Sequence, residues 1–400
     1  MRQILALLTA VSLGAAADTR PKVRAITAFI DIDPQHYEQQ YGDTMRFLDS
    51  AREAYRAAGF EVQGVRIVTQ PFPRYLSGMK PEEALAFLHK LDDLAGRLKF
   101  NPNIGAAMIA DSDPTTWLDT LAHALASTRL NASLVIADEY GIHWRGIRAA
   151  AGLIKKTAEL SPHGRGNLNF AATAMVKSYG PFYPGAWHEG GGHAFAVGLE
   201  GAVVVNEVFA QYKDPPDAER ELSLVLGRHL RDAEQVATKV AESSGWTYAG
   251  IDPTPAPLGD DSIGAAIEKF IGAPFGSSGT MTAARVITGA VQAAPVKHTG
   301  YSGLMVPVLE DNVLARRWAE GTYNIDSLLA YSAVCAGGLD TVPLPGDISE
   351  DRLGRILSDV ATLAFKWNKP LAARLLPVPG GKPGDRTDFG DSRMSDTVIR

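Results

Sequence analysis

The chain has 400 residues, of which 46% are hydrophobic and 21% are charged, and its formal net charge is −6. This composition is typical of a globular protein with either one large α/β domain or two average domains. Because the net charge is mildly negative and no block of lysines or arginines occurs, nucleic acid and anionic membrane surfaces are not expected as partners. A small-molecule ligand or substrate is the expected partner, and a homo-oligomer is left open.

The N-terminus has the layout of a secretory signal peptide. Arg2 precedes the apolar run 4–13, and the small residues Ala15 and Ala17 follow it. The run is shorter than the about 20 apolar residues that span a bilayer, and no later stretch is long and apolar enough. We therefore expect a secreted or periplasmic protein from which the signal peptide 1–17 is removed. The alternatives are a cytosolic N-terminal helix and a wrongly assigned start codon.

Strand-like and helix-like segments alternate through the first part of the chain. The strand-like segments are rich in β-branched and apolar residues, and the helix-like segments have apolar residues at helical spacing. In chain order they are 23–30 (strand), 39–59 (helix), 61–68 (strand), 81–99 (helix), 104–110 (strand), 115–127 (helix), 134–137 (strand) and 143–160 (helix). Such alternation predicts a parallel or mostly parallel sheet covered by helices.

The second part of the chain contains a loop, residues 178–192, that is dense in glycine, proline and aromatic residues. Such loops are where α/β proteins commonly build a ligand site. The other expected strands are 168–174, 194–199, 247–252, 301–311 and 372–378, and the other expected helices include 214–244, 281–294, 312–320, 327–331 and 349–367. No composition break forces a boundary, so a single domain over 18–390 and a loosely packed tail over 391–400 are predicted.

The segment 331–347 places the only cysteine, Cys335, in a stretch rich in glycine, proline and small residues. Its apolar residues predict a shaped loop that packs inward, so it is a candidate wall of a functional site. The alternative is a buried crossover loop in which Cys335 is a small hydrophobic residue and Asp340 and Asp347 cap turns or helices.

Six blocks of the sequence form a distinctive set. They are Val23-Arg-Ala-Ile-Thr-Ala-Phe29, Phe195-Ala-Val-Gly-Leu-Glu200, Asp261-Ser-Ile-Gly264, Phe275-Gly-Ser-Ser-Gly-Thr280, Ser302-Gly-Leu-Met-Val-Pro-Val-Leu-Glu-Asp311 and Cys335-Ala-Gly-Gly-Leu-Asp-Thr-Val-Pro-Leu-Pro-Gly-Asp347. With these blocks, nearly all of residues 22–390 resembles the uncharacterised conserved family known as domain of unknown function 711. The last two blocks are the most specific.

This resemblance implies a fold similar to that of pyruvate formate-lyase, which is a closed ten-stranded α/β barrel with a finger loop held inside. By that likeness the Cys335 loop is the internal finger loop. The resemblance carries no known reaction. It does not make the chain a glycyl radical enzyme, because residues 379–400 contain no Arg-Val-x-Gly-aromatic motif.

Two histidines, His188 and His193, flank a run of glycines. Their spacing of five excludes the zinc-protease helix, which needs histidines four apart on one face. A metal held with a distant carboxylate such as Glu200 or Asp252, general acid/base catalysis, and exposed loop histidines all remain open. Cys335 is a candidate nucleophile or a structural residue, since no histidine stands near it in the sequence.

Several polar residues stand where helices begin. Ser262 is an expected N-cap, and Gly279 and Thr280 precede the helix 281–294. Free backbone N–H groups at such helix starts suit a carboxylate or phosphate, and plain capping is the alternative. Ser302 lacks the Gly-x-Ser-x-Gly pattern of a nucleophile elbow, so it is predicted only to bind ligand.

Five carboxylates fall at expected strand ends or in the Cys335 loop: Asp252, Glu310, Asp311, Asp340 and Asp347. Barrels and open α/β sheets gather active sites at such positions. Two of these groups close together inside a barrel would have pKa values pushed apart, which yields an acid and a base. Singly, each is a cap or a partner for an arginine such as Arg374.

The leading hypothesis is an enzyme that uses acid/base residues in a barrel mouth on a small polar substrate, hydroxylated or carboxylated, as a lyase, isomerase or hydrolase. The expected catalytic residues are His188, His193, Cys335 and Asp340. The expected ligand-binding residues are Asp252, Ser262, Gly279, Thr280, Ser302, Glu310, Asp311 and Asp347. The sequence assigns no cofactor and no metal. The alternative is a non-catalytic exported protein that binds a small anionic ligand.

Overall fold

The computed structural model describes residues 19–400. The predicted signal peptide 1–17 lies outside the described residues. Within them the chain forms a mixed α/β fold, and the predicted alternation of strands and helices is confirmed. In this part of the chain no helix is long and apolar enough to cross a membrane.

The elements follow the sequence patterns closely. The strands are β1 (Lys22–Ile30), β2 (Val65–Thr69), β3 (Asn101–Ala106), β4 (Asn131–Asp138), β5 (Gly141–Ile142), β6 (Phe170–Ala174), β7 (Ala194–Glu200), β8 (Thr247–Asp252), β9 (Gly337–Pro345) and β10 (Leu371–Val378). The helices are α1 (Tyr37–Ala57), α2 (Phe72–Tyr75), α3 (Pro81–Leu98), α4 (Leu118–Ser127), α5 (Trp144–Leu160), α6 (Ala202–Gln211), α7 (Pro215–Ser244), α8 (Ile263–Ile271), α9 (Thr280–Gln292), α10 (Asn312–Glu320), α11 (Ile325–Ser332) and α12 (Glu350–Trp367), with a 3-10 helix at Pro162–Asn169.

All the strands belong to one sheet, whose order is β8-β7-β1-β2-β3-β4-β6-β10-β9, with the short β5 paired to β4. The five central strands run parallel, and the two strands at either edge run in the opposite direction. The prediction of a mostly parallel sheet is therefore confirmed. Central strands such as β1 are buried on both faces, as their continuous apolar sequences require.

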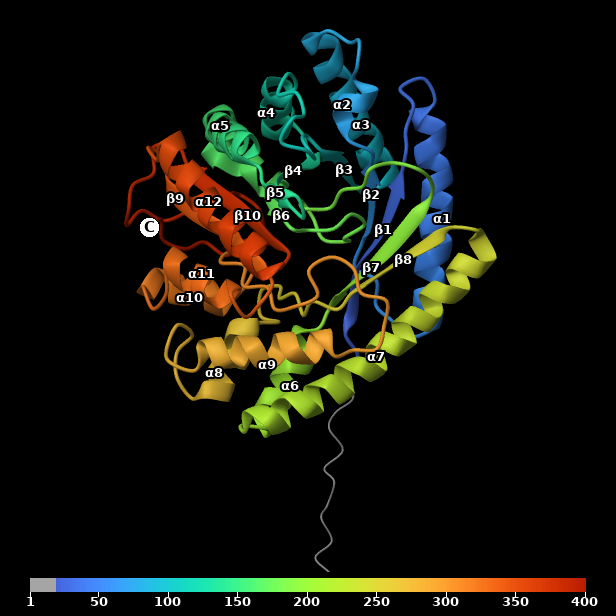
Figure 1. Ribbon diagram of the computed structural model, residues 1–400. Coiled ribbons are helices and arrows are strands. Elements are labelled where there is room, and N and C mark those ends of the chain that lie inside the picture. Colours follow the sequence, from blue (N-terminus) through green and yellow to red (C-terminus); the bar gives the residue numbers. More distant parts are fainter. Residues whose placement is uncertain (1–18) are drawn as a thin grey trace, which may run out of the picture.

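Helices surround the outside of the sheet, and loops occupy its inner side (Figure 1). The loop 175–193 crosses the inner face of the central strands. Its Pro181 carbonyl accepts hydrogen bonds from Thr27 Oγ1 and Arg66 Nη1, both at 3.0 Å, and its Pro184 carbonyl accepts one from Asn103 Nδ2, also at 3.0 Å. These bonds satisfy loop carbonyls that would otherwise be buried without a partner.

The strands β8 and β9 at the two ends of the order do not pair with each other among the described residues, so a closed barrel is not established by strand pairing. The segment 297–309 contacts both of them. Ile251 N in β8 donates to Lys297 O at 2.8 Å, and Val308 N donates to Asp340 O of β9 at 3.0 Å. The strand expected at 301–311 does not form, and these residues make only isolated bridges.

The prediction that the Cys335 segment is an internal finger loop is wrong. Residues 337–345 form β9, paired with β10, and Cys335 lies in the turn between α11 and this strand. The apolar residues that suggested inward packing are buried strand side chains: Leu339, Val342 and Leu344. The loop that lies inside the fold is 175–193.

The prediction of a loose tail over 391–400 is also wrong. Ile399 is fully buried, and Trp318 Nε1 of α10 donates to the Val398 carbonyl at 2.9 Å. Ser395 N donates to Leu309 O at 2.7 Å. The polar composition of the tail hid these contacts because most of them use its backbone, which composition does not report.

Candidate functional site

A cavity of about 470 Å³ opens at one end of the sheet, a volume suited to a small molecule. The central parallel strands begin there, and the reversed edge strands run toward it. Six arginines line it: Arg24, Arg66, Arg129, Arg165, Arg374 and Arg393. Three carboxylates face them: Glu310, Asp340 and Asp391. Two of the arginines also pair with carboxylates that do not line the cavity, Arg24 with Glu200 and Arg129 with Asp92. Arg66 and Arg165 have no ion pair among residues 19–400, and this excess of positive charge favours an anion.

Two β-bulges shape the wall of this cavity. In the pairing of β1 with β7, Arg24 is the extra residue between Val23 and Ala25. In the pairing of β9 with β10, two residues, Asp340 and Thr341, oppose one, Arg374. Bulges turn a side chain away from its regular strand direction and are common beside active sites. Here they bring charged side chains of both strand pairs to the same cavity.

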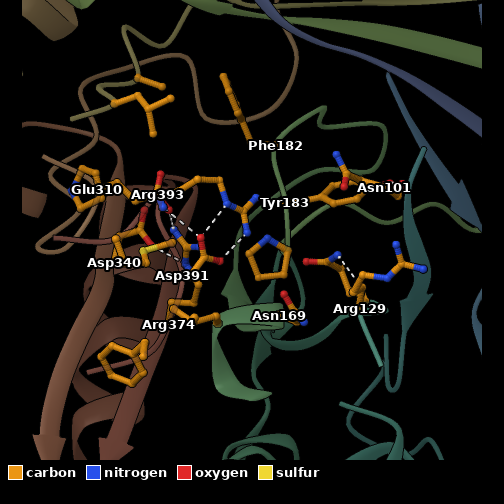
Figure 2. Close-up of a pocket in the computed structure, with 18 of the residues that line it drawn as sticks. Asn101, Arg129, Asn169, Phe182, Tyr183, Glu310, Asp340, Arg374, Asp391 and Arg393 are labelled. Atoms are coloured by element: carbon orange, nitrogen blue, oxygen red, sulfur yellow. Dashed lines mark hydrogen bonds and ion pairs between the residues drawn. The ribbon is translucent and has the colours of Figure 1, made fainter. Parts of the chain in front are cut away.

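Arg374 lies between two carboxylates. Its Nη2 is 2.5 Å from Glu310 Oε1, and its Nε is 2.6 Å from Asp340 Oδ1. Arg24 extends the network, with 3.3 Å to Glu310 Oε2 and 2.9 Å to Glu200 Oε2. Figure 2 shows Glu310, Asp340 and Arg374 meeting at one side of the cavity. These short, buried contacts hold the carboxylates in fixed positions.

The two carboxyl groups that share Arg374 have pKa values shifted in opposite directions. Burial raises the pKa of Asp340, and the attraction of Arg374 does not fully offset it. Burial also acts to raise the pKa of Glu310, but the combined positive charges of Arg374 and Arg24 outweigh it and lower that pKa. Opposite shifts in neighbouring groups are the arrangement that provides an acid and a base.

Arg66 pairs with no carboxylate among residues 19–400, and unlike Arg165, which is also unpaired, it is not exposed. Its Nη1 donates to the Pro181 carbonyl, and its guanidinium lies 4.7 Å from the ring centre of Tyr183. Burial, aided by nearby Arg24, lowers the pKa of Arg66 to about 10, so the group is still cationic at neutral pH. A partly buried cation without a counter-ion is costly, and a bound anion would reduce that cost.

The C-terminal segment supplies one side of the cavity. Arg393 binds Asp391 through two contacts, Nε to Oδ1 at 3.0 Å and Nη2 to Oδ2 at 2.6 Å. This pairing lowers the pKa of Asp391. Figure 2 shows both side chains beside the Glu310 and Arg374 cluster, while Asn101, Arg129 and Asn169 lie at the other side.

The two histidines do not line this cavity. His188 is fully buried against Phe29 and Tyr179, and its Nδ1 accepts the Gly190 N–H at 3.0 Å. Burial lowers its pKa. His193 stacks on Trp246 with 4.7 Å between ring centres. Within residues 19–400, no three potential His, Cys, Asp or Glu ligands gather where they could hold a metal ion.

Cys335 is buried outside the cavity, and burial raises its pKa to about 12. Because the thiolate is the reactive form, we expect iodoacetamide at pH 8 to alkylate the folded protein roughly a thousandfold more slowly than the urea-unfolded chain. Mass spectrometry of timed samples measures both rates. Equal rates in the folded and unfolded states would contradict the buried placement.

Two of the predicted ligand-binding residues anchor a loop outside the cavity. The buried carboxylate of Asp252 accepts hydrogen bonds from the backbone N–H groups of Thr254, Tyr301 and Ser302 at 3.1, 2.7 and 3.1 Å. Ser302 Oγ donates to the Thr299 carbonyl. Burial raises the pKa of Asp252, and its hydrogen bonds offset this only in part. Both residues hold the segment 299–304 against β8.

The other candidates outside the cavity are caps or exposed. Asp311 accepts from Ile263 N and Gly264 N at the start of α8 and from Val313 N and Leu314 N at the start of α10. Ser262 caps α8 through Ala265 N. Gly279 is the N-cap residue of α9, and Thr280 Oγ1 accepts the Gly276 N–H. Asp347 is exposed in a turn.

Of all the residues predicted for catalysis or binding, only Glu310 and Asp340 line the cavity.

Sequence reasoning missed Arg24, Arg66, Asp391 and Arg393. A signal for the first two was present, because each interrupts an otherwise apolar strand, as Arg374 also does. A charge inside such a strand is expensive to bury unless it has a partner or a function. No comparable signal marks the tail residues, which reach the cavity only through tertiary contacts.

Comparison with known proteins identifies the family of this chain. The family model described as "Uncharacterised ACR (DUF711)" matches residues 16–392. The chain belongs to this family. It is 34% identical to a UPF0210 protein of Pyrobaculum aerophilum, over 92% of this chain and 87% of that protein. It is 30% identical to a UPF0210 protein of Desulforudis audaxviator, over 86% of this chain and 80% of that protein.

The resemblance predicted from the sequence is thus confirmed for DUF711. A relative from Methanopyrus kandleri, also named a UPF0210 protein, is 34% identical over 68% of this chain and 63% of its own length. These names assign no reaction to the family.

Proposed function

We propose that this DUF711 protein is an enzyme that binds a small anionic substrate in the arginine-lined cavity. The observation that carries the proposal is the pair Glu310 and Asp340, which share Arg374 at the cavity wall while their pKa values shift in opposite directions. Asp340 keeps its proton more readily and acts as the general acid. Glu310 stays ionised and acts as the general base. Such a pair serves a lyase, an isomerase or a hydrolase.

Arg66 is the proposed anchor for the anionic group, because its charge has no carboxylate partner among residues 19–400. We expect Arg66→Met to weaken binding of inorganic phosphate or citrate at least about tenfold, since a charge-assisted contact is lost. Isothermal titration calorimetry measures the change. The control is Arg46→Met on the exposed side of α1, where Arg46 pairs with Asp43. Equal affinity in wild type and Arg66→Met would contradict the anchor.

Acid/base roles for the carboxyl pair have a direct kinetic consequence. Once a thermal-shift screen of small acids and phosphate esters has found a substrate, Glu310→Gln and Asp340→Asn should each lower kcat about a hundredfold. The control Asp347→Asn alters an exposed turn residue and should leave kcat unchanged. Unchanged turnover in both cavity variants would remove these roles.

The second candidate function is a non-catalytic binding protein for a small anion. It is favoured by one observation: each carboxylate of the cavity is already paired with an arginine. Mass spectrometry separates the two functions, because a ligand that stabilises the protein and is recovered unchanged after prolonged incubation supports binding alone.

We further propose two features of the whole molecule. The segment 297–309 completes a barrel of the pyruvate formate-lyase type, supported by its hydrogen bonds to both β8 and β9. The protein is exported after removal of residues 1–17, supported by the signal-like sequence, most of which precedes the family match over residues 16–392. Export is tested by mass spectrometry of the protein recovered from outside the cells that produce it. A mass that matches residues 18–400 supports removal of the signal peptide.

A further inference from the structure

Three asparagines stand in a row along the edge of the sheet that borders the cavity. Asn101 is the first residue of β3, Asn131 is the first residue of β4, and Asn169 directly precedes β6. These strands are neighbours in the sheet, and all three residues line the cavity. The row begins next to Arg66, whose register partner across β2 and β3 is Asn101.

The distance across the strands from Arg66 to Asn169 suits a small extended ligand. Neighbouring strands lie about 4.8 Å apart, so three strand spacings from Arg66 to Asn169 cover roughly 14 Å. The last two asparagines lie side by side, because Ala132 pairs with Phe170 one residue further along. The row is staggered at its first step, because the register partner of Asn131 on β3 is Asn103, two residues after Asn101. A ligand held at Arg66 can therefore extend past the amide groups.

These amides have free hydrogen-bonding capacity. Asn131 uses both amide hydrogens, which donate to the carbonyls of Pro102 at 3.0 Å and Arg129 at 3.1 Å, and its Oδ1 is left as an acceptor. The side chains of Asn101 and Asn169 make no hydrogen bond to another residue in the part of the chain that the structure describes. Their amides therefore offer both donors and acceptors to a ligand.

We propose that the cavity takes a polyhydroxylated anion, either a sugar acid or a sugar phosphate. Its anionic group binds Arg66, and its hydroxyl groups bind the row of Asn101, Asn131 and Asn169. A hydroxyl both donates and accepts, as an amide does, whereas an alkyl chain in the same place would displace water from these amides without replacing its hydrogen bonds. The inference rests on the proposed function only for the anion site at Arg66.

The test compares four probes by isothermal titration calorimetry on the full chain. Gluconate and hexanoate share a six-carbon carboxylate but differ in hydroxyls, sorbitol has the hydroxyls without the charge, and glucose 6-phosphate carries a phosphate. We expect gluconate or glucose 6-phosphate to bind at least about tenfold more tightly than hexanoate and sorbitol. The tighter of the two distinguishes a sugar acid from a sugar phosphate.

The variant Asn101→Ala/Asn169→Ala should weaken binding of the tighter sugar ligand about tenfold and leave hexanoate binding unchanged. The control Gln39→Ala removes an amide from the exposed face of α1 and should change neither. Equal affinities for gluconate, glucose 6-phosphate and hexanoate would overturn the hydroxyl row while leaving the anion site intact. If no anion binds at millimolar concentration, the proposed function and this inference both fail.

Discussion

Replacing Arg374 by methionine should lower the free energy of unfolding by about 4 kcal/mol at pH 7, because it leaves two buried carboxylates without their shared cation. Arg374 is 8% exposed and lies within 2.6 Å of both Glu310 and Asp340. Methionine fills much of the same volume, so most of the loss reflects uncompensated charge rather than a cavity. Urea unfolding, monitored by circular dichroism, measures the change.

The loss in Arg374→Met should depend on pH in a defined direction. Without Arg374, burial raises the pKa of Asp340 further above its unfolded value. The pKa of Glu310 also rises from its lowered value, although Arg24 still contacts it at 3.3 Å, so the folded state takes up protons. Groups with raised pKa values favour folding below the unfolded pKa, near 4 to 4.5, and lose that contribution as the pH rises. The destabilisation should therefore shrink between pH 7 and pH 4.5, measured as the difference from wild type at each pH.

A second variant separates charge from packing. Arg374→Met combined with Glu310→Gln and Asp340→Asn removes all three charges together. This triple variant should recover more than half of the lost stability at pH 7, since neutral amides cost less to bury than unpaired carboxylates. A triple variant as unstable as Arg374→Met at every pH would show that the loss comes from packing.

Asp311→Ala should destabilise the fold by about 4 kcal/mol, because one carboxylate caps two helices. Asp311 is fully buried and accepts four backbone hydrogen bonds, from the first turns of α8 and α10, and a fifth from Ser262 Oγ at 2.6 Å. Alanine would leave these donors buried without an acceptor. The shift of the urea midpoint at constant slope measures the effect.

The matched control is Asp214→Ala, which removes a single-helix cap. Asp214 is exposed and accepts one bond from Asp217 N at 3.4 Å at the start of α7. Its loss should cost about 1 kcal/mol or less. If Asp311→Ala costs no more than this control, the double cap contributes far less than its geometry indicates.

The sequence alone predicted much of the local structure. Apolar and β-branched runs predicted β1, β2 and β8, helical spacing predicted α7 and α12, and Ser262 was correctly expected as an N-cap. These features succeed because periodicity and capping depend on residues a few positions apart. The family was also readable, because its most specific blocks are contiguous.

The candidate site was only partly predictable. Glu310 and Asp340 were chosen as carboxylates near expected strand ends, and both line the cavity. Asp252 and Asp311 met the same criterion, yet their oxygens are used by backbone N–H groups. A sequence does not tell a carboxylate that caps a helix from one that faces a ligand, because the difference lies in which distant backbone approaches it.

Sequence by itself thus determined the alternation of strands and helices and the family. Only the tertiary structure decided that residues 337–345 are an edge strand, that the C-terminal segment walls the cavity, and that bulges at Arg24 and Asp340 turn charges toward it. The physical reason is that strand order, register and bulges arise from hydrogen bonds between segments up to hundreds of residues apart, which no local pattern encodes.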